Sequence, residues 1–213
     1  MKFYQDQLVT GGASNNPLPT AHRLIYVRHG AVIANGRRME ADSTGYFNEP
    51  VNFEAAAHWS QVWRWDLAWP NADPALLAGN GVLSTLRMAR VITTLEMAEE
   101  SQWLFRLDRI TSAAGRVTPR HQHHGPGIRC LYQGTFNVQD ASEVVQDRIP
   151  GDPWWESGVD TVVAWHSRQL PAIFIRALVL PVELQGAMSN IWKSNGPPPQ
   201  ANWHLFIDEV ITL

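Results

Sequence analysis

The chain contains a single cysteine, Cys130, among its 213 residues. An internal disulfide is therefore excluded, and the composition fits a reducing compartment. Long hydrophobic runs are also missing. The most apolar segment, 171–182, is interrupted by Arg176 and is far too short to span a bilayer, and the first ten residues lack the apolar run of a signal peptide. We expect a cytoplasmic protein without a membrane partner, in which Cys130 is a buried structural thiol.

Charge is sparse and nearly balanced: 17% of the residues are charged, the net charge is -3 and the pI is ≈ 6.2. Basic residues are scattered, and Arg37-Arg38 is the only adjacent pair, so nucleic acid is not an expected partner. The chain has no Gly-rich phosphate loop, G-x-S-x-G elbow or C-x-x-C motif. Tryptophan, in contrast, is abundant, with ten residues. Because indole rings are favoured in pockets and subunit contacts, some of these residues are expected to line a cavity or a homodimer interface.

Short β-branched and aromatic runs separated by turn residues recur along the chain and predict strands. The expected strands cover residues 22–30, 31–34, 37–47, 51–57, 61–69, 102–110, 128–132, 135–138, 144–149, 159–165, 173–180 and 203–213. Asn35-Gly36 predicts a hairpin turn. The segment 82–90 fits a helix, 91–97 is better read as a strand, and 195–201 is a stiff, proline-rich connector. This pattern is typical of an all-β sandwich or barrel.

The two halves of the chain resemble each other. Arg23-x-x-Tyr26 recurs as Arg129-x-x-Tyr132, and each motif is followed shortly by a glycine. The strand predicted at 62–70 has a counterpart at 173–181, at a nearly constant offset along the chain. This repetition predicts a duplicated β-domain.

The segment 115–134, GRVTPRHQHHGPGIRCLYQG, contains the main candidate functional side chains. Its H-x-H step places His121 and His123 on one face of a strand, about 7 Å apart along the chain. Two imidazoles in this arrangement can share one metal ion. His124, the next residue, is expected to point to the opposite face.

At this point the chain resembles the cupin superfamily, whose first motif is G, five residues, H-x-H, three or four residues, E, six residues, G. Gly115, His121, His123 and Gly134 stand at the expected spacing, but the Glu position falls on 127 or 128, so that acid is missing. The second motif maps loosely onto 151–165. There Gly158 keeps its place, Glu156 replaces the proline, and Thr161 stands where the histidine would be.

The resemblance implies tandem cupin barrels of the double-stranded β-helix or jelly-roll type. It places a degenerate N-terminal barrel in 1–75, a linker and shared strand in 76–100, the C-terminal barrel with the site in 101–181, and an arm and strand in 182–213. The last strand is expected to cross back to the N-terminal barrel or to a second subunit. The resemblance also implies a homodimer.

In function, the resemblance implies a metal-dependent enzyme, with a dioxygenase as one option, acting on a small carboxylated or aromatic molecule. His121 and His123 would hold Fe, Zn, Ni or Mn. A third ligand is sought among His166, Asp160 and Glu156, and the sequence leaves the choice open.

Three further side chains are candidates for binding the substrate. An inward-facing Arg129 would hold a carboxylate bidentately; the alternative is a salt bridge to Asp160 or Glu156. Trp154 and Trp155 are adjacent on a strand, so only one of them can face the cavity. That one would form an aromatic wall, or else pack between the barrels.

Two other functions are compatible with the sequence. One is a metal-free cupin that binds or senses a small molecule through Arg129 and a tryptophan. The other is a histidine phosphatase, which the strand ending in Arg28-His29-Gly30 resembles. That family requires an α/β architecture and a second catalytic histidine in a Ser-His-Gly-like context, and the pattern of short strands favours the cupin instead.

Overall fold

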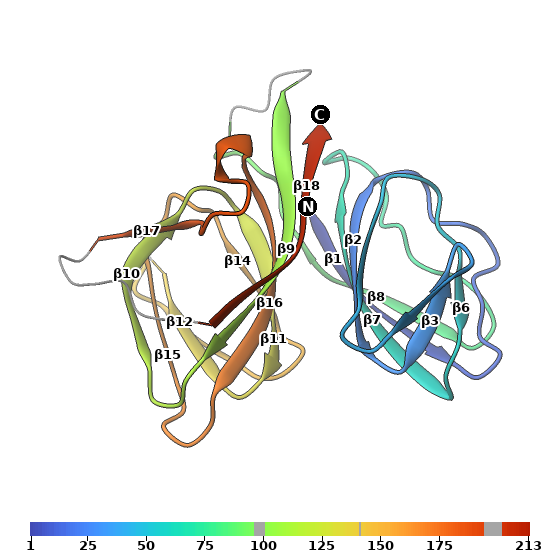
Figure 1. Ribbon diagram of the computed structural model, residues 1–213, viewed down its shortest axis with the longest axis horizontal. Coiled ribbons are helices and arrows are strands. Elements are labelled where there is room, and N and C mark those ends of the chain that lie inside the picture. Colours follow the sequence, from blue (N-terminus) through green and yellow to red (C-terminus); the bar gives the residue numbers. More distant parts are fainter. Residues whose placement is uncertain (96–100, 141, 194–201) are drawn as a thin grey trace. The chain divides into compact units, whose positions relative to one another are not determined.

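The structure, a computed structural model, describes residues 1–95, 101–140, 142–193 and 202–213. The chain divides into two compact units, Met1–Val91 and Ile92–Leu213. Figure 1 shows that each unit is built from antiparallel strands. Helical structure in the described ranges is limited to the 3-10 turn η1 (Val182–Leu184), and no described helix has the length and hydrophobicity needed to cross a bilayer. The all-β prediction is confirmed.

The first unit contains two antiparallel sheets. Its strands are β1 (Lys2–Val9), β2 (His22–His29), β3 (Ala31–Ala34), β4 (Arg37–Glu40), β5 (Thr44–Phe47), β6 (Phe53–Ala55), β7 (Trp59–Leu67) and β8 (Val82–Ala89). One sheet has the order β5-β2-β7-β1-β8, and the other has the order β4-β3-β6. Asn35 and Gly36 join β3 to β4 with φ values of 46° and 77°. These positive values are the ones that a two-residue type I′ turn requires, so the hairpin prediction is confirmed.

The second unit contains two five-stranded antiparallel sheets. Its strands are β9 (Gln102–Ser112), β10 (Val117–His123), β11 (Gly127–Gln133), β12 (Phe136–Gln139), β13 (Val145–Arg148), β14 (Pro153–Glu156), β15 (Val162–His166), β16 (Ala172–Pro181), β17 (Asn190–Trp192) and β18 (Asn202–Thr212). The sheet orders are β14-β11-β16-β9-β18 and β13-β12-β15-β10-β17. The apolar residues between the sheets include Phe136, Trp154 and Phe174.

The two units share one sheet topology. The order β5-β2-β7-β1-β8 matches β14-β11-β16-β9-β18 when the strands of each unit are counted from its first strand and β10 and β17, which belong to the other sheet of the second unit, are left out of the count. The units differ in the second sheet. Between β9 and β11 the chain forms β10, whereas the corresponding segment between β1 and β2 makes only the isolated bridges Ala13–Glu54 and Leu18–Val51. Among the described residues, the strand that carries H-x-H in the second unit therefore has no regular counterpart in the first.

Packed side chains occupy the interior of the first unit. Along β7, Val62, Arg64 and Asp66 share one face: Val62 joins an apolar cluster, while the two charged residues are completely or almost completely buried. Asp66 accepts from Arg23 Nε at 2.8 Å and from Arg64 Nη1 at 2.5 Å, and Arg64 Nε lies 2.9 Å from Asp6 Oδ2. Two arginines and two aspartates thus neutralise each other in the core.

The segment 82–90 forms a strand, β8, rather than a helix. Exposed and half-buried residues alternate along it, and it pairs with β1 through Leu8–Val82 and the following residues. It belongs to the first unit and lies within the segment 76–100, for which the sequence predicts a linker and a shared strand. A period-two pattern with one half-buried face is typical of an edge strand.

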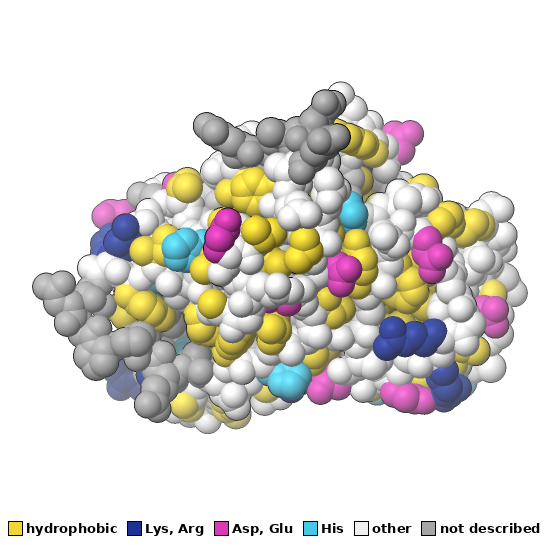
Figure 2. All heavy atoms as spheres, turned by 45° about the horizontal axis from the view of Figure 1, so that its top comes forward, with side chains coloured by type: hydrophobic (Ala, Val, Ile, Leu, Met, Phe, Trp, Pro, Cys, Tyr) yellow, Lys and Arg dark blue, Asp and Glu magenta, His cyan; other side chains and the backbone are white. Residues whose placement is uncertain are grey.

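The end of the chain also differs from the sequence prediction. β18 pairs with β9 of its own unit along almost its whole length, whereas the sequence predicts a crossing to the N-terminal barrel or to a second subunit. For the strand predicted at 91–97, residues 91–95 lie outside any strand, and the rest lie outside the described residues. The connector predicted at 195–201 also lies outside them. On the face shown in Figure 2, acidic, basic and hydrophobic side chains are interspersed.

Candidate metal centre

β10 brings the two histidines of the H-x-H step to one face, as the strand period predicts. His121 and His123 are 5% and 6% exposed, and their ring centroids lie 5.0 Å apart. His124 is exposed. β10 pairs with β15 on one side and with β17 on the other, so both imidazoles are held inside the second unit.

Glu156 joins these histidines from the neighbouring sheet. The ligand atoms of His121, His123 and Glu156 all lie within 4.8 Å of one another. In the β11–β14 pairing Glu156 stands directly opposite Gly127, the position where the cupin motif places its acid. A Cβ atom at Gly127 would lie 2.1 Å from the carbonyl oxygen of Ala177. The carboxylate therefore enters the site from the partner strand instead.

Hydrogen bonds orient both imidazoles. His121 Nδ1 lies 2.8 Å from the carbonyl oxygen of Pro119. Because a carbonyl only accepts, Nδ1 carries the proton and the lone pair is on Nε2. His123 Nδ1 lies 3.1 Å from Ser189 Oγ, and its Nε2 lies 3.0 Å from Glu156 Oε2.

The carboxylate of Glu156 is 9% exposed, and its two oxygens differ in environment. Oε1 accepts a hydrogen bond from Trp154 Nε1 at 2.8 Å. Oε2 is 2.9 Å from Arg129 Nη2 and 3.0 Å from His123 Nε2, yet neither group directs a hydrogen bond at it. A buried oxygen in this situation is unusual, because buried polar atoms nearly always have a partner.

Burial and the nearby charges set the protonation of the site. Burial lowers the pKa of His123 to about 3, despite the opposing effect of Glu156, and burial also lowers the pKa of His121. Burial by itself would raise the pKa of Glu156, but Arg129 and then His123 outweigh it and hold that pKa well below its ordinary value. At neutral pH the site therefore presents two neutral imidazoles and one carboxylate, which are the forms that bind metals.

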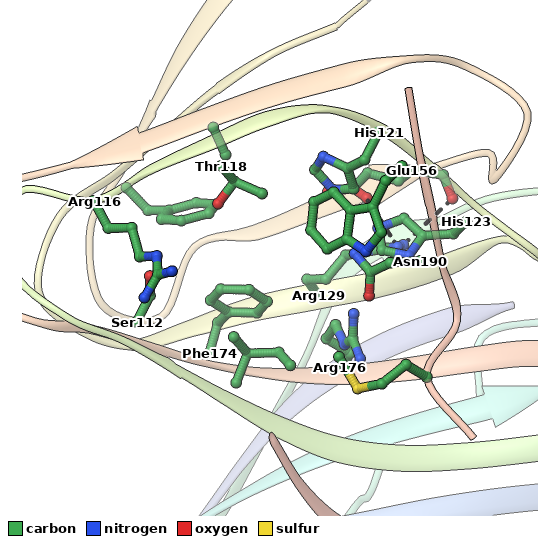
Figure 3. Close-up of a pocket in the computed structure, with 15 residues that line it drawn as sticks. Ser112, Arg116, Thr118, His121, His123, Arg129, Glu156, Phe174, Arg176 and Asn190 are labelled. Atoms are coloured by element: carbon green, nitrogen blue, oxygen red, sulfur yellow. Dashed lines mark hydrogen bonds and ion pairs between the residues drawn. The ribbon is translucent and has the colours of Figure 1, made fainter. Parts of the chain in front are cut away.

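The site opens into a cavity of about 60 Å³ within the second unit (Figure 3). Arg129 and Arg176 line it, together with the phenyl rings of Phe136 and Phe174. Arg129 Nη1 also donates to the carbonyl oxygen of Gly127 at 2.6 Å. Arg176 is paired with Asp108 through two contacts of 2.7 and 2.8 Å. The cavity thus combines cationic and aromatic walls.

The other residues singled out in the sequence occupy different places. Trp154 is buried on the Arg129 side of β14 but supports Glu156 instead of lining the cavity, and Trp155 projects from the opposite face. Asp160 is exposed and bonds to Ser157. His166 is buried on β15 with neither ring nitrogen hydrogen-bonded, and it does not join the ligand group. Of the three candidates for third ligand, the structure brings only Glu156 to the histidines.

The segment 189–192 contributes residues that sequence reasoning missed. Ser189 bonds to His123, Asn190 lines the cavity, and the ring of Trp192 lies 5.4 Å from that of His121. No motif marks these residues, because they reach β10 from almost seventy positions further along the chain.

Arg28-His29-Gly30 lies at the end of β2 in an antiparallel sheet. His29 is exposed, and its ring packs 4.7 Å from that of Trp59. A histidine phosphatase requires an α/β architecture, and the described elements are strands and one 3-10 turn. The phosphatase interpretation is therefore wrong.

The three donors fit a divalent cation. Two imidazole nitrogens and one carboxylate oxygen form a known ligand set. Metal–ligand bonds of about 2.1 Å would place the donor atoms at most about 4.2 Å apart, so small side-chain movements are enough to close the group. Oε2 of Glu156, which forms ion-pair contacts but no hydrogen bond, is the atom that a cation would satisfy.

Fold and site together define a jelly-roll protein with a two-histidine, one-carboxylate group in its C-terminal unit. AerE from Microcystis aeruginosa is similar in structure, with 13% identity, 85% of this chain and 89% of that chain covered, and a TM-score of 0.61. The oxalate decarboxylase of Lactobacillus farciminis, solved as a formate complex, has 11% identity, 90% and 79% coverage, and a TM-score of 0.59.

An oxalate decarboxylase from Bacillus subtilis, studied for its Mn(II) centres, has 9% identity, 83% and 68% coverage, and a TM-score of 0.55. No family model matches the chain, and no curated protein matches it in sequence. These structural neighbours are cupin-family proteins, and at such low identities the likeness shows the fold alone: the chain has a cupin fold.

Proposed function

We propose that this protein is a metal-dependent cupin enzyme that acts on a small carboxylated or aromatic molecule. His121, His123 and Glu156 would hold the cation. The observation that carries this proposal is the buried Oε2 of Glu156, which lies within 3.0 Å of two nitrogens without a directed hydrogen bond from either. A cation between the carboxylate and the imidazoles would remove this deficit.

The ligand set and the neighbours indicate which metals to test. Two histidines and one carboxylate are the ligands of non-haem iron oxygenases, which keeps a dioxygenase among the options. A structural neighbour is described by its Mn(II) centres. Fe²⁺ and Mn²⁺ are therefore the first candidates, followed by Zn²⁺ and Ni²⁺. Such an ion, when bound, acts as a Lewis acid on a substrate oxygen.

The cavity favours a small anionic substrate. Its volume of about 60 Å³ corresponds to roughly four to six water molecules, at about 10–15 Å³ each. Arg129 and Arg176 supply positive charge, and Phe174 supplies an apolar wall. A structural neighbour is a formate complex of an oxalate decarboxylase. In this proposal Arg129 orients a substrate carboxylate, and Trp154 acts indirectly by positioning Glu156.

Element analysis of the purified protein tests the metal site. We expect about one divalent ion per chain, and background levels in His121→Ala, His123→Ala and Glu156→Gln. His124→Ala is the matched control, since it removes an exposed histidine from the same segment, and it should retain the metal. Background metal in the wild type after growth in supplemented medium would overturn the proposal.

One observation favours a second candidate, a metal-free cupin that binds or senses a small molecule. Arg129 already places a cationic group 2.9 Å from Glu156, so the carboxylate has a counter-charge within the protein. In this case a small carboxylate should raise the melting temperature of chelator-treated protein by mass action and be recovered unchanged. A shift that appears only after metal is added favours the enzyme instead.

We further propose that the chain is a tandem cupin whose N-terminal barrel is degenerate. The matching strand order of the sheets β5-β2-β7-β1-β8 and β14-β11-β16-β9-β18 supports this proposal. So do the reduced second sheet and the filled interior of the first unit. In this interpretation only the C-terminal unit does chemistry.

A further inference from the structure

A short segment outside the two motifs lies along the H-x-H strand. We call residues 189–192 the β17 strap. It pairs with β10 through His121–Trp192, Gln122–Ile191 and His123–Asn190. Ser189 is fully buried and bonds to His123 Nδ1, while Trp192 packs on His121. The strap is therefore held against both histidines of the metal group.

β15, the other strand that pairs with β10, offers no metal ligand beside the two histidines. His121 stands opposite Val162 of β15, which is 3% exposed and part of the apolar core. The next inward residue, Ala164, lines the cavity without a polar atom in its side chain. Thr161, which occupies the histidine position of the second motif, precedes β15 and belongs to no ligand group in the described residues.

Asn190 places a polar group on the strap side of the same cavity. Its Oδ1 is buried and has no hydrogen-bond partner. Asn190 and His123 are directly opposite in the β10–β17 pairing, which puts their Cβ atoms about 4.5–5.5 Å apart on one face. In Figure 3 the amide lies beside His123, between the ligand group and Arg176.

We propose that Asn190 is the fourth protein ligand of the metal, supplied by the β17 strap in place of the missing second-motif histidine. This inference rests on the proposed function, because it requires that His121, His123 and Glu156 bind a metal. The last side-chain torsion of asparagine is broad, so the amide can turn its oxygen towards an ion. An amide carbonyl is a hard donor of the kind that suits Mn²⁺.

The test measures Mn²⁺ affinity by calorimetry on the full chain, for the wild type, Asn190→Ala and Asn190→Asp. We expect Asn190→Ala to bind at least about tenfold more weakly, the scale on which lost metal-site groups act. Asn190→Asp should bind as tightly as the wild type or more tightly, because a carboxylate adds an anionic donor. Ile191→Val, on the opposite face of the strap, is the matched control and should leave the affinity unchanged.

The outcomes separate this inference from the proposed function. Wild-type protein that binds none of Mn²⁺, Fe²⁺, Zn²⁺ and Ni²⁺ overturns both. Wild-type protein that binds, with Asn190→Ala unchanged or with Asn190→Asp weakened as much as Asn190→Ala, overturns only the role of Asn190. Circular dichroism and melting temperatures of the metal-free variants identify any loss of folding. If Asn190→Ala does not fold, Asn190→Asp decides alone: weaker binding than wild type rejects the ligand role.

Discussion

At the scale of single residues, the centre of the candidate site is the buried carboxylate of Glu156, whose Oε2 has two close nitrogen neighbours but no hydrogen bond. Glu156 lies close to Arg129 and His123, and its other oxygen is bonded to Trp154. Among the described residues, Arg129 is the only arginine that forms an ion pair with Glu156. A metal and this guanidinium would therefore compete for the same buried oxygen.

Replacing Arg129 tests this competition. In Arg129→Met the buried Glu156 loses its main cationic neighbour, and we expect the metal-free protein to lose about 3–5 kcal/mol of unfolding free energy. Saturating Mn²⁺ should then raise the melting temperature more than it does in wild-type protein. Thermal unfolding with and without Mn²⁺ measures both effects. Arg120→Met, an exposed change on the preceding strand β10, is the control, and equal Mn²⁺ shifts in Arg129→Met and wild type would contradict the idea.

The stability of the metal-free protein should depend on pH through His123. Its pKa is lowered to about 3 in the folded state because it is buried, while an unfolded histidine titrates near about 6.5. Between these values the unfolded chain binds a proton that the folded protein does not. Stability is therefore complete above about pH 6.5 and falls as the pH is lowered towards 3, at about 1.4 kcal/mol per pH unit.

Urea unfolding in chelator at pH 7 and pH 5 measures this loss, which should be about 2 kcal/mol from His123. His123→Asn should reduce the pH dependence, whereas His124→Ala should not. Glu156 adds to the loss only below the unfolded value of about 4.3, because its folded pKa is lowered. An unchanged pH dependence in His123→Asn would argue against the buried, neutral imidazole.

At the scale of elements, the pairing of β11 with β14 explains how the acid reaches the site. Gly127 lies opposite Glu156 and packs against the backbone of β16. Any side chain at position 127 would collide with the carbonyl oxygen of Ala177 and with Leu178. The acid is therefore on β14, where its carboxylate can reach both histidines.

Gly127→Ala should accordingly destabilise the protein, although alanine is only one methyl group larger. We expect a loss of about 1–3 kcal/mol, the usual range for overpacking a buried site. Urea unfolding measures it. Stability equal to wild type would show that β16 yields easily and that glycine is not required there.

At the scale of the whole molecule, each unit contains a sheet of the same strand order, but the interiors of the two units differ. The first unit closes its interior with the Asp6, Arg23, Arg64 and Asp66 network, in which each acid is neutralised by an arginine. The second unit pairs Arg176 with Asp108 but leaves a cavity beside the histidines. The buried charges of the first unit are thus structural, and those of the second surround a site.

Asp66→Asn should separate these roles. It removes the charge shared by Arg23 and Arg64, and breaking such a buried pair costs about 3–5 kcal/mol. Metal content per folded chain should stay at the wild-type level, because the ligands are in the other unit. Urea unfolding and element analysis check the two statements. Asp73→Asn, an exposed change in the same unit, should alter neither, and loss of metal in Asp66→Asn would contradict the separation.

The homodimer expected from the abundance of tryptophan stays a prediction. Light scattering of the purified chain measures it: a mass near twice 23.9 kDa is the expected result. A mass equal to one chain would contradict it.

The order of residues was enough to predict the strands, the hairpin at Asn35-Gly36 and the shared face of His121 and His123. These features depend on local rules: turn chemistry and the period of two along a strand. The assignment of 82–90 as a helix failed because that segment becomes a strand through its pairing with β1, which is more than seventy positions away.

The rest of the site was decided only by tertiary structure. Glu156 was one of three candidates until the β11–β14 register placed it opposite Gly127, and Ser189 and Asn190 carried no motif at all. The two histidines of the H-x-H step are close together in the sequence, so a single strand is enough to bring them together. The carboxylate and the β17 strap come from strands far along the chain, and their positions depend on register and packing, which no local pattern encodes.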